Sequence, residues 1–224
     1  MHHEPSHVVL LQGSWLAGAE ATVMGRRLAD RYRFDTRQLS YRTARASLQQ
    51  NVQHLRDFVE HDLRPRESTP CHFVGHSLGG LVILKMLMEW THAPVGRVVL
   101  LGTPLAGADS ALRLATLTGG ESLLGDSIAA ENYLDCDAML SDCSAQRDVG
   151  MIAGTMCVGR GDRIRELPRP NDGSVVARET QHDCLTDHLS LAATHTTLVT
   201  SREVIDQVAG FLTHGRFNRD RKRG

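Results

Sequence analysis

Residues 73–80 read Phe-Val-Gly-His-Ser-Leu-Gly-Gly, and this stretch decides the fold of the chain. It contains a Gly-x-Ser-x-Gly motif, with an apolar segment before it and the apolar run Leu81 to Met88 after it. Where a strand turns sharply into a helix, this motif places its serine in a strained turn, with the hydroxyl at the edge of a sheet. The pattern therefore predicts that Ser77 is a nucleophile at a strand-to-helix corner.

The composition is typical of one substantial globular domain. The chain has 224 residues, of which 41% are hydrophobic and 23% charged, and its formal net charge is −1. This balance gives no general attraction to nucleic acid or to an anionic membrane. We expect a cytoplasmic protein, because the sequence shows no membrane-spanning run, no signal peptide and no disulfide spacing among its five cysteines.

Apolar runs alternate with segments of helical spacing along the chain. Strands are expected at residues 7–11, 32–41, 71–74, 97–101, 149–158 and 187–191, and helices at 20–30, 44–63, 81–88 and 203–212. This alternation predicts an α/β fold with a mostly parallel sheet and helices on both faces. Ligands of such sheets bind beyond the carboxyl ends of the strands, where Gln12, Ser77 and Thr103 would gather.

Two segments interrupt the alternation. Residues 107–148 are longer than a normal connection and contain scattered leucines, so we expect a helical lid or cap over the site. A peripheral helix pair without a role in access is the alternative. Residues 215–224 hold five basic residues and one acidic residue, and we expect a disordered, solvated tail, with weak contact to an anionic surface as the alternative.

A serine hydroxyl needs a base to accept its proton, and the base needs an orienting acid. In sheet hydrolases the chain order is serine, acid, histidine. His195 fits the base because it lies in a loop before the last predicted helix, whereas His182 and His188 lie in or before a predicted strand. Metal binding is not expected, since the cysteines and histidines form no ligand cluster.

Two aspartates could be the acid. Asp172 lies in an Asn-Asp-Gly turn that would hold its side chain rigidly. Asp162 follows a predicted strand more directly, but neighbouring arginines indicate a solvated side chain. We favour Asp172 and keep Asp162 as the alternative.

A tetrahedral intermediate also needs two backbone N–H donors. One is expected from Leu78, directly after the serine, and the other from Ser14, in the loop after the first strand. The residues expected to line the substrate pocket are Gln12, Trp15, His76, Thr103 and Leu105.

These motifs resemble the α/β-hydrolase superfamily, and within it bacterial lipases and GPI inositol-deacylase-like esterases. The resemblance extends over most of the chain and is carried by residues 75–80, 101–107, 171–175 and His195. It implies a Ser77–His195–Asp172 triad, and the Asn-Asp-Gly turn favours Asp172 over Asp162. The family usually has His-Gly after the first strand, where this chain has Gln12-Gly13. Gln12 can still form hydrogen bonds and brace the loop.

The resemblance implies a serine hydrolase that cleaves carboxylic esters through an acyl-enzyme, without a metal or other cofactor. Leucines in the predicted lid favour an apolar, lipid-like acyl group, so the expected partner is a small-molecule or lipid ester, with at most peripheral membrane contact. Two alternatives remain on the same scaffold. One is an acyltransferase, and the other is an inactive binding protein in which Gln12 marks the loss of catalysis.

Overall fold

The computed structural model contains a six-stranded sheet in which every pair of neighbouring strands is parallel. The structure describes residues 5–12, 19–39, 47–66, 68–105, 135–157 and 167–219. The strands are β1 (His7–Leu11), β2 (Asp35–Leu39), β3 (Cys71–His76), β4 (Val98–Leu101), β5 (Val149–Gly154) and β6 (Asp187–Leu191). Their order, β2-β1-β3-β4-β5-β6, places β3 and β4 at the centre. The predicted α/β class with a parallel sheet is confirmed.

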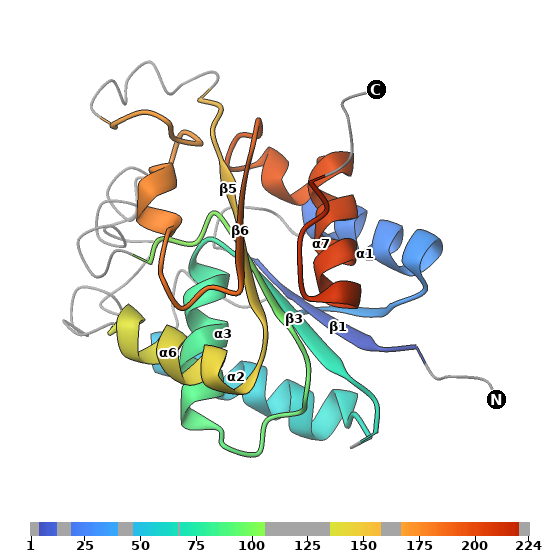
Figure 1. Cartoon of the computed structure of the whole chain (residues 1–224). Helices are drawn as coiled ribbons and strands as arrows, with labels where there is room; N and C mark the ends of the chain where they lie inside the picture. Colours follow the sequence, from blue (N-terminus) through green and yellow to red (C-terminus); the bar gives the residue numbers. More distant parts are fainter. Residues whose placement is uncertain are drawn as a thin grey trace.

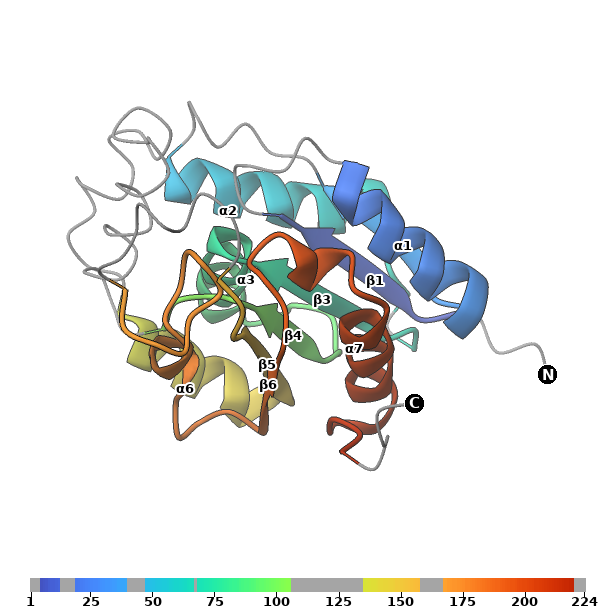
Figure 2. The same cartoon turned by 90° about the horizontal axis from the view of Figure 1, so that it is seen from above.

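Helices cover both faces of the sheet (Figures 1 and 2). One face carries α1 (Ala19–Tyr32) and α7 (Arg202–His214), and the other carries α2 (Leu48–Asp57), α3 (Leu78–Glu89) and α6 (Cys136–Gln146). Each face has its own apolar cluster, because alternate side chains of a strand point to opposite sides. No described helix is long and apolar enough to cross a membrane.

The predicted helix over residues 44–63 is shorter and less regular than expected. It begins as α2 after Ser47, whose hydroxyl accepts a hydrogen bond from the Gln50 N–H, while the Gln50 side chain accepts one from the Ser47 N–H. It continues as a π-helical turn, η1 (Phe58–Leu63), and ends at Arg64 in the left-handed conformation. The cap and the left-handed residue set its two ends.

The structure corrects the extent of the predicted lid. Residues 136–146 form α6, whose Met139 and Leu140 are buried in the same apolar cluster as α3. The apolar positions of this segment follow a helical spacing, so they cover the sheet and do not form a cap. Residues 107–134 of the predicted lid lie outside the described residues.

The predicted tail is also shorter than expected. Gly215 ends α7 in the left-handed conformation, and the buried Phe217 ring packs on Phe211 with their ring centroids 4.9 Å apart. Arg219 then binds the Asp187 carboxylate with two nitrogens, at 2.5 and 3.0 Å. These contacts hold residues 215–219 against the end of the domain, and residues 220–224 lie outside the described part of the chain.

β3 and α3 approach each other so closely that only glycine fits between them. A Cβ atom on Gly75 would lie 2.5 Å from the Cα of Gly80 and 2.7 Å from its backbone nitrogen. Both neighbours are backbone atoms, which cannot turn aside as a flexible side chain could. The contact therefore sets the angle at which the chain leaves β3 and enters α3.

We expect Gly75→Ala to lower the free energy of unfolding by about 1–3 kcal/mol, because the added methyl group overpacks a rigid contact. Urea unfolding followed by circular dichroism measures the change. Gly210→Ala is the matched control, since a Cβ there meets nothing within 4 Å and alanine favours a helix. Equal stability of the Gly75 variant and the parent would contradict the packing argument.

A buried histidine makes the stability of this sheet depend on pH. His72 lies in β3, and its Nδ1 accepts a hydrogen bond from the Arg97 N–H at 2.9 Å. Burial, and to a smaller extent the nearby Arg97 charge, lower the pKa of His72 from 6.5 to about 4. The folded state therefore holds a neutral imidazole at pH values where the unfolded chain is already protonated.

Because the unfolded state binds more protons between pH 6.5 and about 4, stability should fall as the pH drops through this range. His72 should contribute at most about 3 kcal/mol to this loss. Urea unfolding at several pH values, for the parent and for His72→Asn, isolates the effect, since asparagine can still accept the Arg97 hydrogen bond. Parallel pH curves for the two proteins would show that His72 is not responsible.

Candidate active site

Ser77 occupies a strained corner between β3 and α3. Its φ and ψ are 56° and −127°, a region that residues other than glycine rarely adopt. The Ser77 N–H donates to the carbonyl oxygen of Leu101 at 2.9 Å, and its own carbonyl accepts from the Gly80 N–H and the Thr103 hydroxyl. Strain of this kind costs about 1–3 kcal/mol and persists only where surrounding contacts impose it. Here the end of β4 and the first turn of α3 impose it.

Asp172 and His195 form a hydrogen-bonded pair. Oδ2 of Asp172 lies 2.7 Å from Nδ1 of His195, and the Asp172 carbonyl accepts the His195 backbone N–H at 2.8 Å. The other carboxylate oxygen accepts backbone N–H groups from Ser174 and Val175 in the Asn-Asp-Gly turn. The turn therefore fixes the carboxylate, and the carboxylate fixes the imidazole through both its side chain and its backbone.

This pairing sets the tautomer of His195. A carboxylate oxygen can only accept, so Nδ1 carries the proton and Nε2 of the neutral ring is left as an acceptor. Nε2 is buried and has no hydrogen-bond partner among the described residues. The arrangement can therefore take a proton at Nε2 while Asp172 stabilises the resulting imidazolium.

Backbone and ring contacts bring this pair to the Ser77 corner. Gly102, which follows β4, packs so closely on the pair that a Cβ atom there would lie 3.0 Å from Asp172 Oδ2 and 3.2 Å from His195 Nδ1. The His76 ring, next to Ser77 in the chain, lies 4.5 Å from the His195 ring, centroid to centroid. In the sequence, Gly102 directly follows the strand predicted at residues 97–101, and a glycine at that position is the one signal of this close packing.

The competing candidates are engaged elsewhere or lie outside the described residues. Nε2 of His188 lies 2.9 Å from the Thr180 hydroxyl, and burial lowers the pKa of His188. His182 contacts the carboxylate of Asp137 at 3.0 Å. Asp162 is outside the described part of the chain. Of the three histidines considered for the base, only the one at position 195 contacts Asp172 in the described structure.

Two residues expected to line the substrate pocket instead face the protein interior. Thr103 is fully buried, and its hydroxyl supports the Ser77 carbonyl. His76 is 4% exposed, and its Nε2 lies 2.9 Å from the His195 carbonyl oxygen. Both corrections have the same cause, because side chains next to a tight corner point back into the layers that hold it. Leu105 is buried in the apolar cluster on the α3 face.

The expected oxyanion donors can be placed in part. Leu78 is the first residue of α3, and the N–H groups of a first helical turn have no partner within the helix. Gly79 packs against the end of β1, where an added Cβ would lie 2.4 Å from the Leu11 carbonyl oxygen. The start of α3 is therefore adjacent to the end of β1 and to Gln12, which follows it. Ser14 and Trp15 lie outside the described residues.

Buried polar atoms without partners concentrate at this edge of the sheet. Four such side-chain atoms occur among the described residues: Gln12 Nε2, His76 Nδ1, Arg147 Nε and His195 Nε2. Three of them belong to the predicted site, and each costs about 1–3 kcal/mol if it stays unpaired. The pKa of His76 lies well below its usual value, because burial and then the electrostatic interaction with His195 disfavour its protonated form, so His76 is neutral. A loss of free energy from unpaired buried polar atoms is typical of a functional site.

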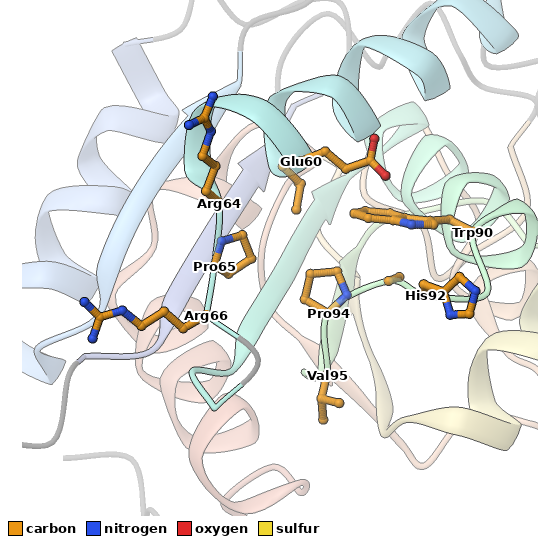
Figure 3. A pocket seen from close by; sticks show the side chains of 10 residues that line it. Glu60, Arg64, Pro65, Arg66, Trp90, His92, Pro94 and Val95 are labelled. Atoms are coloured by element: carbon orange, nitrogen blue, oxygen red, sulfur yellow. The ribbon is translucent and has the colours of Figure 1, made fainter.

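A separate cavity of about 440 Å³ lies at the opposite end of the sheet, where β3 and β4 begin (Figure 3). Its walls include Arg64, Trp90, Pro94 and Val95. One group of metal-type ligands among the described residues lies nearby on α2 and η1: Asp57, Glu60 and His61. Their atoms are within 4.8 Å of one another, but exposed acidic groups often cluster without a metal. Neither the cavity nor this group of ligands includes a residue of the predicted site around Ser77.

The sequence matches the model of the alpha/beta hydrolase family over residues 8–209. No curated protein matches the chain. Among solved structures, lipase BlEst2 of Bacillus licheniformis, in its mature form, is 18% identical, with 96% of this chain and 94% of that chain covered and a TM-score of 0.64. The lin2722 product of Listeria innocua is 16% identical, with 96% of each chain covered and a TM-score of 0.61.

Est1E of Butyrivibrio proteoclasticus is 11% identical, with 95% of this chain and 88% of that chain covered and a TM-score of 0.64. At such low identity these similarities show the fold, whereas the family match extends over most of the sequence. With its parallel sheet, its serine corner and this match, the chain belongs to the alpha/beta hydrolase family.

Proposed function

We propose that this protein is a serine hydrolase that cleaves carboxylic esters through an acyl-enzyme. One observation carries the proposal: the Asp172–His195 pair leaves a buried, unpartnered Nε2 atom on a ring that packs against His76, the residue before Ser77. Such a nitrogen can accept the proton of a serine hydroxyl, which is otherwise a poor nucleophile at neutral pH.

In the proposed reaction, Ser77 Oγ attacks the ester carbonyl carbon as its proton passes to His195 Nε2. Asp172 keeps the imidazole in the required tautomer and stabilises its positive charge. The backbone N–H groups of Leu78 and Ser14 bind the developing oxyanion. His195 then protonates the leaving alcohol, and a water molecule, deprotonated by the same nitrogen, releases the acid from Ser77.

The substrate class is proposed as a small-molecule or lipid-like ester. Solved structures of this fold include a lipase, BlEst2, and Est1E with bound ferulic acid. Phospholipase PlaB of Legionella pneumophila shares the fold over 79% of this chain. The leucines of residues 107–134 favour an apolar acyl group, and a chain-length series of p-nitrophenyl esters tests this preference.

We expect Ser77→Ala to lower kcat/KM for p-nitrophenyl butyrate by at least about 10³-fold, because the acyl-enzyme can no longer form. The variant should also lose labelling by a fluorophosphonate probe. Ser190→Ala, an exposed position on β6, is the control that should keep both. Hydrolysis by Ser77→Ala at the parent rate would exclude the proposed nucleophile.

We expect Asp172→Asn to lower kcat by about 10³–10⁴-fold, because an amide can stabilise the wrong histidine tautomer and cannot balance the imidazolium charge. Asp162→Asn should retain the parent kcat. Circular dichroism of both variants confirms folding before kinetics are compared. If only Asp162→Asn loses activity, the acid has been assigned to the wrong turn.

A further inference from the structure

A small cavity lies under the predicted site, on the face of the sheet covered by α1 and α7. Its volume is about 10 Å³, and its walls come from the ends of β1, β3 and β4, with α1 and the short helix η4 (Thr197–Val199) closing it. Gln12 and His76 are its polar lining residues, 8% and 4% exposed. The other described lining side chains are apolar, so among the described side chains these two supply the polar groups that an occupant could bind.

The two polar residues present complementary groups. His76 Nε2 lies 2.9 Å from the carbonyl oxygen of His195, and a carbonyl can only accept, so Nε2 carries the proton. Nδ1 of the same neutral ring is then an acceptor, and it has no partner among the described residues. Gln12 Nε2, which is a donor, is likewise unpartnered within the described structure. One unpartnered donor and one unpartnered acceptor therefore belong to the two polar residues that line this small cavity.

We propose that Gln12 and His76 bind one buried water molecule, which accepts from Gln12 Nε2–H and donates to His76 Nδ1. The cavity is at the lower limit of the space that one water needs, about 10–15 Å³, and two partners are the minimum for a buried water. The volume matches a single water. The occupant is thus identified by volume and by hydrogen-bond direction together.

This water makes His76 a positioning residue for the base, an extension that rests on the proposed function. With Nδ1 occupied by a water proton, His76 keeps its own proton on Nε2 and donates it to the His195 carbonyl. The His195 backbone is then held by His76 on one side and by the Asp172 carbonyl on the other. Gln12, where the resembled family has histidine, supplies a donor that does not titrate.

The first test uses the unmodified protein and does not depend on activity. In a high-resolution crystal structure we expect a water within about 2.7–3.2 Å of both Gln12 Nε2 and His76 Nδ1. In ¹⁵N spectra of the histidine rings at neutral pH, we expect His76 to be protonated at Nε2 only. An empty cavity, a direct Gln12–His76 hydrogen bond or a proton on Nδ1 would overturn the proposal.

The second test asks whether the water positions the base. Gln12→Leu removes the donor, and we expect kcat for p-nitrophenyl butyrate to fall about tenfold with little change in KM, together with a changed ¹⁵N shift at His76 Nδ1. Gln12→His, which restores an N–H donor, should recover most of the rate. A leucine variant with parent kcat and an unchanged shift would overturn the positioning role.

Gln207→Leu is the matched control, because Gln207 is a buried glutamine on α7 whose amide bonds to the Asn218 backbone. Its replacement can lower stability but should leave kcat and the His76 shift unchanged. An unmodified protein without esterase activity would refute the proposed function alone, since the crystal and ¹⁵N results test the water independently.

Discussion

The end of β4 contacts both Ser77 and the Asp172–His195 pair, and the rest of the site depends on these contacts. The Leu101 carbonyl accepts the Ser77 N–H and so holds the strained corner at the end of β3. The next residue, Gly102, lacks a side chain, so the Asp172–His195 pair can pack directly against the backbone. A Cβ atom there would meet the carboxylate at 3.0 Å and push the pair away from the corner. Two adjacent backbone residues, Leu101 and Gly102, therefore align groups that are far apart in sequence.

The layers around this contact explain why it can be rigid. Apolar clusters fill both faces of the sheet, and close-packed interiors transmit small displacements. Polar side-chain atoms that lack partners in the described structure occur mainly at the carboxyl edge of β1 and β3 and on His195. The free energy lost by leaving them unpaired is offset by the packing elsewhere, as expected when a protein maintains a strained, polar site. A water under His76 would recover part of that loss.

Much of the fold was predictable, because parallel strands buried on both faces appear in the sequence as short apolar runs. The bounds of β1 and β6 were predicted as observed, and the other strands differ at their ends. Prediction was wrong where non-local contacts decide. Residues 136–146 were assigned to a lid, yet their apolar side chains are buried in the same cluster as those of α3. The basic end of the chain was assigned to a disordered tail, yet the buried Phe217 and the Arg219–Asp187 pair hold residues 215–219 in place. Charge and length alone do not reveal such partners.

For the candidate site, the sequence by itself determined the chemical groups: a serine in a Gly-x-Ser-x-Gly turn, a histidine before the last helix and an aspartate in an Asn-Asp-Gly turn. These follow from local backbone geometry, which short motifs encode. Only the tertiary structure decided that Asp172 binds His195, that Gly102 supports the pair and that His76 and Thr103 face inward. Such contacts join segments separated by many residues, and their geometry depends on how the layers pack around the sheet.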